Sequence, residues 1–178
     1  MIIREAELTD AGRIARVHVD TWRSAYRGIV PDARLDRLSY ERAADIARQM
    51  IGNGLSTSFI LVAEADDEIV GFASAGPVRD TEAAETGELY AIYIVHSHQR
   101  RGIGHLLVKA VVRRLLAQGM RSLLVWVLRD NPARGFYARL GGQLVGSKTV
   151  SIAERDLEEV SYRWDDMAVI LGAGDGRT

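Results

Sequence analysis

The order of elements in the middle of the chain restricts the fold more than any other feature. The apolar run Gly87–Val95 predicts a β-strand, and the amphipathic stretch Gly102–Gln118 predicts a helix that begins at a glycine-containing turn. The continuously apolar run Leu123–Leu128 is typical of a strand that is covered on both faces. A strand, a helix and a second strand in this order predict a parallel pair with a right-handed crossover.

The segments on either side add antiparallel hairpins and further helices. Periodicity and turn residues predict strand Ile2–Ala6, helix Asp10–Tyr26 capped by Thr9, helix Asp32–Met50 broken at Ser39, strands Ser58–Glu64 and Ile69–Val78, helix Ala133–Leu140, and strands Leu144–Ile152 and Leu157–Asp165. The fold class is therefore α+β: a mostly antiparallel central sheet with one parallel pair and helices on both faces. Ile46 and Leu106 are expected on the apolar faces of their helices. Residues 1–171 are expected to form this domain and residues 172–178 a disordered tail.

Composition narrows the class of function. A length of 178 residues suits one domain, and a net charge of −1 provides no field toward nucleic acid or an anionic membrane, so neither is expected as a partner. The chain has no cysteine, which excludes disulfides, thiolate metal sites and a cysteine nucleophile. No apolar run approaches membrane-spanning length, and the N-terminal residues Met1–Glu5 predict a strand rather than a signal peptide. A cytoplasmic enzyme is expected.

The turn Gln99–Gly104 has the features of a pyrophosphate cradle. Its glycines allow backbone N–H groups to crowd together, and the unpaired amides at the following helix start favour an anion. Arg100 and Arg101 add positive charge. The turn lacks the lysine of a P-loop, and it lacks the third glycine and the downstream acidic residue of a dinucleotide-binding fingerprint. A simple tight turn into a helix is the alternative interpretation.

Three motifs together resemble a known family. Gln99, Gly102 and Gly104 match the pattern Q/R-x-x-G-x-G/A, and the run from Asn131-Pro132-Ala133 through Phe136-Tyr137 to Leu140-Gly141 matches N-x-A-x-x-F-Y-x-x-x-G. The strand Leu89–Val95, preceded by Glu88, resembles the core strand of the same proteins. Over residues 86–146 the sequence is thus similar to the GNAT superfamily of acetyl-CoA-dependent N-acetyltransferases. One departure is Gly142, where many members have phenylalanine.

The resemblance implies where acetyl-CoA binds. In the family, two parallel strands splay apart and the pantetheine arm pairs with backbone between them, which here matches Ile92, Ile94 and Val95, with the Ile92 N–H at the thioester oxygen. The implied acetyl-CoA-binding residues are Ile92, Ile94, Val95, Gln99, Arg100, Arg101, Gly102, Ile103, Gly104, His105, Asn131 and Phe136.

The resemblance also implies catalytic roles. Transfer to an amine requires a neutral amine, a polarised carbonyl and a protonated leaving thiolate. Tyr137 matches the family's general acid, and Glu88 matches the position of the general base in histone acetyltransferases; a core phenol and a solvated carboxylate are the alternatives. Tyr26 and Arg27 are candidate acceptor contacts. Tyr90 is expected on the same face as Glu88 unless a bulge intervenes.

Several functions remain open from the sequence alone. The leading hypothesis is acetylation of a primary amine in a ternary complex, with a small-molecule acceptor. The alternatives are a protein N-terminus or lysine as acceptor, or a non-catalytic acyl-CoA-binding regulatory module. His96, His98 and His105 surround the cradle, but they lack carboxylate or cysteine partners, so no metal is expected. Self-association as a homodimer is an open option.

Overall fold

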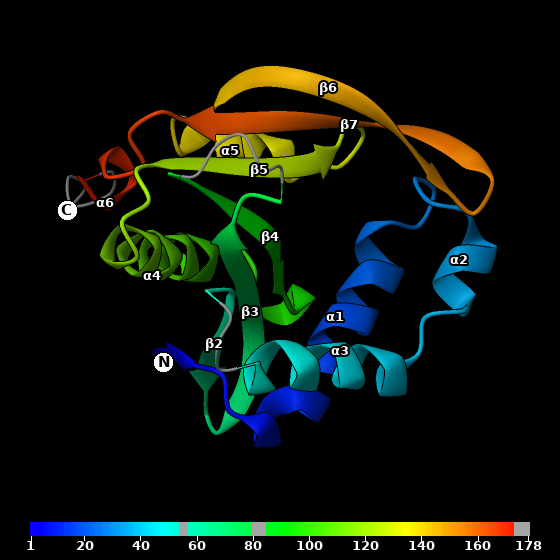
Figure 1. The fold of residues 1–178 in the computed structure, drawn as a ribbon. Coiled ribbons are helices and arrows are strands. Elements are labelled where there is room, and N and C mark those ends of the chain that lie inside the picture. The colour runs from blue at the N-terminus through cyan, green and yellow to red at the C-terminus, as the bar shows by residue number, and fades with distance from the viewer. Residues whose placement is uncertain (54–56, 80–84, 173–178) are drawn as a thin grey trace.

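A computed structural model describes residues 1–53, 57–79 and 85–172. Seven strands form one sheet in the order β1-β2-β3-β4-β5-β7-β6 (Figure 1). The strands are β1 Ile2–Glu5, β2 Phe59–Ala65, β3 Glu68–Pro77, β4 Thr86–Ile94, β5 Ser122–Leu128, β6 Gln143–Ile152 and β7 Arg155–Trp164. The helices are α1 Ala11–Ala25, α2 Asp32–Asp36, α3 Tyr40–Gly52, α4 Ile103–Ala117, α5 Arg134–Arg139 and α6 Val169–Gly172, with 3₁₀ turns η1 Leu8–Asp10 and η2 His96–His98. The α+β prediction is confirmed, because β4 and β5 are parallel and the other neighbouring strands of this sheet are antiparallel.

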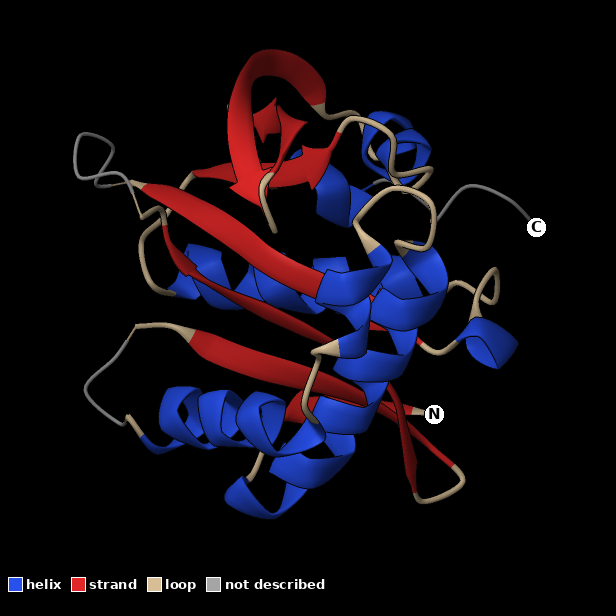
Figure 2. Cartoon of the chain, turned by 90° about the vertical axis from the view of Figure 1, so that its right-hand side faces the viewer, coloured by secondary structure: helices blue, strands red, loops and turns tan. Residues whose placement is uncertain are grey.

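Helices cover both faces of the sheet (Figure 2). On one face, α4 buries Leu107, Val111 and Leu115 against the central strands. On the other face, α1 and α3 pack on β2 and β3 through a second apolar cluster that includes Ile14 and Phe72. No helix in the described part of the chain is long and apolar enough to cross a membrane.

Local sequence signals account for most element boundaries. Ser39 interrupts the predicted long helix and caps α3, since its hydroxyl accepts a hydrogen bond from the Arg42 N–H. The β2–β3 hairpin turns through Asp66 and Asp67, which both have positive φ. A two-residue turn of this conformation matches the right-handed twist of the two strands that it joins. The β6–β7 hairpin turns in the same way through residues 153 and 154, a tighter turn than the sequence suggested.

Some predictions of burial and boundaries are wrong. Ile46 and Leu106 are 61% and 43% exposed, because each lies at the edge of its helix's apolar stripe rather than at its centre. The carboxylate of Asp10, rather than the Thr9 hydroxyl, organises the start of α1. Gly172 closes the unpredicted helix α6, and the expected disorder of the tail concerns residues 173–178, which lie outside the described residues.

Asp10 joins the first strand to α1. Its carboxylate is fully buried and accepts hydrogen bonds from Arg4 at 2.6 and 3.1 Å, from Arg13 at 2.6 Å and from the Glu7 N–H at 2.8 Å. The hydrogen bonds from Arg4 are the main cause that lowers the pKa of Asp10 to about 2. A buried charge satisfied in this way fixes the position of α1 relative to the sheet.

The parallel strands β4 and β5 separate halfway along their length. Their pairing extends from Thr86–Ser122 to Leu89–Val125 and then stops, although β4 continues to Ile94. At the point of separation β4 has a bulge at Tyr90, because Leu89 pairs with Ala75 and Ala91 with Ser74. Bulges bend a strand and increase its twist, and Figure 1 shows β5 turning away from β4.

Candidate active site

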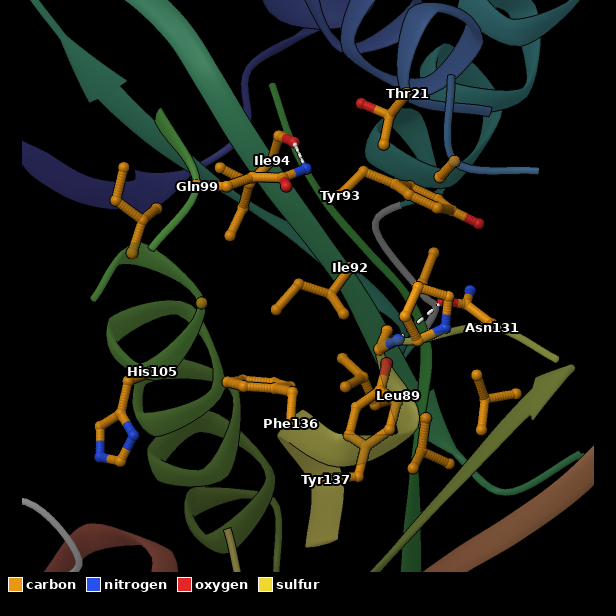
Figure 3. Close-up of a pocket in the computed structure, with 18 of the residues that line it drawn as sticks. Thr21, Leu89, Ile92, Tyr93, Ile94, Gln99, His105, Asn131, Phe136 and Tyr137 are labelled. Carbon is orange, nitrogen blue, oxygen red and sulfur yellow. Dashed lines mark hydrogen bonds between the residues drawn. The ribbon is translucent and has the colours of Figure 1, made fainter. Parts of the chain in front are cut away.

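A cavity of about 560 Å³ opens where β4 and β5 separate (Figure 3). It extends from the start of α4 and from α5 on one side of the sheet to the end of α1 on the other. Its lining includes Thr21, Ala25, Tyr26, Leu89, Tyr90, Ala91, Ile92, Tyr93, Ile94, Gln99, Arg100, Gly102, Ile103, Gly104, His105, Trp126, Asn131, Phe136, Tyr137 and Arg139. Most of the residues predicted to bind acetyl-CoA therefore face one space, although they come from four separate elements.

The loop before α4 has the backbone shape of an anion cradle. The Gln99 side-chain amide donates a hydrogen bond of 2.9 Å to the Ile94 carbonyl, which ties the loop to the end of β4. Arg100 and Gly102 both have positive φ, 59° and 81°, and the first α-helical hydrogen bond of α4 runs from the Leu106 N–H to the Gly102 carbonyl. The amides at positions 103 and 104 precede this bond and have no partner within the helix. Arg100 lines the cavity, whereas Arg101 is exposed outside it.

The two glycines of this loop serve different purposes. A side chain at Gly102 would project into open space, but the left-handed φ of this residue strains any L-amino acid. At Gly104 a Cβ would lie 3.3 Å from both the Ile94 and the Phe136 side chains. Gly104 therefore allows α4 to approach β4 and α5 closely, and Gly102 shapes the turn itself.

The register of β4 leaves alternate backbone groups facing the gap. The Val95 N–H donates to the Val70 carbonyl of β3. Because hydrogen-bonded positions alternate along an antiparallel pair, Tyr93 and Ala91, two and four residues earlier, also direct their backbone groups toward β3. The N–H and C=O groups of Ile92 and Ile94 consequently point toward β5, where no strand pairs with them. The prediction for Val95 is wrong, because its N–H is bonded to β3 and its C=O accepts from the His98 N–H.

Asn131 organises the start of α5. Its Oδ1 accepts a 2.8 Å hydrogen bond from the Ala133 N–H, and its Nδ2 donates to the Tyr26 hydroxyl at 3.1 Å. The side chain thus holds α5 and the end of α1 at fixed positions on the cavity wall. One hydrogen of the amide is left over, since an NH₂ group has two donors.

Tyr137 lies on α5 with its ring buried. It is 5% exposed and its ring contacts Phe136 and Tyr162, with centroids 5.4 and 6.0 Å away. Figure 3 shows the Tyr137 hydroxyl pointing into the space between Ile92 and Asn131. Burial raises the pKa of this phenol well above its usual value, so the group is protonated at neutral pH.

Glu88 lies in a different setting from the one that the sequence suggested. Its side chain is 3% exposed, is not among the residues that line the cavity, and accepts hydrogen bonds from the Arg79 guanidinium and from the Arg79 N–H at 3.2 Å. This pairing raises the pKa of Arg79. Tyr90 does line the cavity, but its hydroxyl donates to the Pro77 carbonyl and is therefore turned toward β3.

The end of α1 forms the remaining wall. Tyr26 is 8% exposed and lines the cavity. Arg27 is exposed, lies with its guanidinium 4.0 Å from the Asp32 carboxylate, and is not among the residues that line the cavity. Sequence reasoning missed Thr21 and Tyr93 on this wall. The only available signal for Tyr93 was its alternation with Ala91, which is typical of any strand.

Two further sequence features are the histidines near the cradle and the glycine after α5. Within residues 1–53, 57–79 and 85–172, no group of three metal-binding side chains is found. At Gly142 a Cβ would lie 2.6 Å from the Trp164 ring, whose indole N–H donates to the Leu140 carbonyl. The Trp164 indole thus occupies the space next to this glycine.

Comparison with known proteins agrees with this geometry. A model of the acetyltransferase (GNAT) family matches residues 18–142. The uncharacterized N-acetyltransferase YuaI of Bacillus subtilis is 35% identical over 168 residues, covering 94% of this chain and 95% of YuaI. The phosphinothricin N-acetyltransferase of Streptomyces viridochromogenes is 32% identical over 82 residues, 46% of this chain and 45% of that protein.

A solved structure extends the agreement to the fold. The PaiA N-acetyltransferase of Thermoplasma acidophilum, in complex with coenzyme A, has a TM-score of 0.75 at 19% identity and covers 92% of this chain and 98% of its own. The family match over most of the chain, the relative matched along nearly its whole length and the common fold lead to one conclusion. This chain belongs to the GNAT family and is an acetyl-CoA-dependent N-acetyltransferase.

Proposed function

We propose that the protein transfers the acetyl group of acetyl-CoA directly to a small primary amine within a ternary complex. The observation that carries the proposal is the single cavity at the separation of β4 and β5. It unites an anion-binding helix start, unpaired backbone groups of a strand and a buried, protonated phenol. Direct transfer from a thioester to an amine uses these three features and needs no nucleophile on the enzyme.

The proposed binding mode follows the order of groups along the cavity. The start of α4 at positions 103–105, with Arg100, binds the pyrophosphate, and Arg101 acts from outside the loop. The backbone groups of Ile92 and the Ile94 N–H hydrogen-bond the pantetheine arm as a further strand would. Asn131 offers its second amide hydrogen, and the Phe136 ring packs against the arm next to Gly104.

The proposed chemistry is a general-acid-assisted acyl transfer. The amine nitrogen forms a bond to the thioester carbon, and the Ile92 N–H stabilises the oxyanion that develops. When the carbon–sulfur bond breaks, the electron pair stays on sulfur, and the Tyr137 hydroxyl donates its proton to that thiolate. A phenol kept neutral by burial carries the proton that this step requires.

Glu88 remains the proposed base, acting through water. The Arg79 guanidinium covers the carboxylate and is itself 67% exposed, so proton transfer to Glu88 requires Arg79 to move aside or water to enter between them. The alternative is a structural role, in which the ion pair fastens the end of β3 to β4. The pH dependence of the Glu88→Gln variant separates the two roles.

Two observations favour a small acceptor. The relative named phosphinothricin N-acetyltransferase acts, by its name, on a small molecule, and it matches about half of the chain. The bulky aromatic rings of Tyr26, at the end of α1, and Tyr93, on β4, also close the acceptor side of the cavity. A protein N-terminus or lysine remains the second candidate, because a ribosomal-protein-alanine N-acetyltransferase from Brucella melitensis has the same fold at a TM-score of 0.73.

The experiment measures thiol release from acetyl-CoA with a panel of small amines and of peptides with free N-termini or lysines. Turnover with small amines and none with peptides is the expected result. Preference for peptides would overturn the acceptor class, and acetyl-CoA binding without turnover on any amine would favour a non-catalytic module.

A further inference from the structure

Two hydrogen-bonded pairs of side chains lie along the acceptor side of the cavity. The Trp22 indole N–H donates to the Tyr93 hydroxyl at 2.8 Å, and Asn131 Nδ2 donates to the Tyr26 hydroxyl at 3.1 Å. Burial raises the pKa of both hydroxyls, so both are protonated at neutral pH. The two pairs connect the α1 region to β4 and to the loop before α5.

In each pair the partner of the tyrosine can only donate. An indole nitrogen has a hydrogen and no lone pair available for hydrogen bonding. The orientation of the Asn131 amide is determined by the Ala133 backbone N–H, which can bond only to Oδ1 and so turns the NH₂ group toward Tyr26. Each tyrosine oxygen is therefore the acceptor in its pair.

The Tyr26 hydroxyl has a proton that this pairing does not use. Its oxygen accepts from Asn131, so its own proton points elsewhere. Among the hydrogen bonds of the described residues, none is donated by the Tyr26 hydroxyl, which belongs to a residue that lines the cavity.

A second polar group on the same wall lacks a partner. Thr21 is 7% exposed and lines the cavity, and its hydroxyl is buried without a hydrogen bond to any described residue. A buried hydroxyl without a partner costs about 1–3 kcal/mol, so such a group is typical of a site that a ligand or water completes. Thr21 and Tyr26 both come from the last turns of α1.

The charge around these hydroxyls indicates what they bind. The described residues that line the cavity include Arg100, Arg139 and His105 but no aspartate or glutamate. Glu88, the carboxylate expected to attract a cationic acceptor, is instead paired with Arg79 and lies outside the lining. The wall thus presents O–H donors without negative charge, which complements an oxygen rather than a second cation.

We infer that Tyr26 determines acceptor specificity by donating its hydroxyl proton to an oxygen that the amine substrate carries. The substrate class is a small primary amine with a carboxylate, carbonyl or other oxyacid oxygen a few bonds from the nitrogen, in preference to a plain alkylamine or a polyamine. This inference rests on the proposed function.

The test compares L-amino acids and their amides with the matching amines that lack the carboxyl group. The wild-type protein is expected to have the higher kcat/KM for the oxygen-bearing member of each pair. Tyr26→Phe should lower that kcat/KM by about 10- to 100-fold, the effect of one hydrogen bond to a charged or polar oxygen, and should change the value for the oxygen-free amine less than about threefold.

The matched control is Tyr40→Phe, which removes a hydroxyl from an exposed tyrosine on α3 whose partner is Asp20. It should leave both members of each pair unchanged. Equal losses for both members in Tyr26→Phe, or a wild-type preference for oxygen-free amines, would overturn the inference and leave the proposed function intact. Failure of the wild-type protein to acetylate any amine, with acetyl-CoA binding retained in calorimetry, would overturn both.

Discussion

Replacing Asp10 by asparagine is expected to lower the free energy of unfolding by about 2 kcal/mol at pH 7. Asp10 holds β1 and α1 together through Arg4 and Arg13, and its hydrogen bonds lower its pKa from 3.8 to about 2. At about 1.36 kcal/mol per tenfold change in proton affinity, this lowering corresponds to about 2.4 kcal/mol. Because Arg13 is 39% exposed, solvent screening makes this an upper value.

The sign of the pH dependence follows from the lowered pKa. A carboxyl whose pKa is lower in the folded state stabilises the protein fully above its unfolded pKa near 4, and this stabilisation is lost as the pH falls through about 2. At pH 3 the remaining contribution is about 1.3 kcal/mol by the same relation. The difference between wild-type protein and Asp10→Asn should therefore shrink by almost half between pH 7 and pH 3.

Urea unfolding followed by circular dichroism at both pH values measures these differences, and urea is preferred because guanidinium chloride would screen the ion pairs. The matched control is Asp45→Asn, which removes an exposed ion pair with Arg48 and should cost less than about 0.5 kcal/mol. A loss below about 0.5 kcal/mol for Asp10→Asn at pH 7, or a loss that does not change with pH, would refute the reasoning.

Three further predictions concern the site. Gly102→Val should abolish acetyl-CoA binding while the protein remains folded, because β-branching is incompatible with φ 81° at the cradle; unchanged affinity in calorimetry would refute the cradle. Tyr137→Phe keeps the ring and removes the proton, so kcat should fall by about 10²–10⁴ with acetyl-CoA affinity retained; a change within about twofold would mean that the phenol only packs. Glu88→Gln should remove the acidic limb of the pH profile of kcat/KM and recover partly at high pH, where the amine loses its own proton; a complete wild-type profile would assign Glu88 a structural role opposite Arg79.

Features that depend on near neighbours along the chain were accessible from the sequence. The strand, turn and helix from Gly87 to Gln118 were predicted because apolar periodicity and glycine placement are local properties. The helix break at Ser39 was predicted for the same reason. The parallel pairing of β4 with β5 was also predicted, because a strand–helix–strand connection is almost always a right-handed crossover. Gln99, Gly102 and Gly104 were identified because they match the family's Q/R-x-x-G-x-G/A pattern.

Features that depend on contacts between distant segments were decided by the tertiary structure. Trp22 and Tyr93 are 71 positions apart, and Tyr26 and Asn131 are 105 positions apart, yet two hydrogen bonds join them into one wall. Nothing in the pattern around these residues distinguishes them from ordinary core aromatic residues. Their direction of donation exists only once α1 and α5 meet across the cavity.

Glu88 and Val95 illustrate the physical reason. Both lie on a strand whose position along the chain was predicted well, but the sequence does not show which neighbour each group contacts. The β3–β4 register brings Arg79 over the Glu88 carboxylate and aligns the Val95 N–H with the Val70 carbonyl. Residue types and spacing therefore determined the fold and the glycine turn before α4, whereas register, a one-residue bulge and long-range hydrogen bonds decided which groups of β4 reach the cavity.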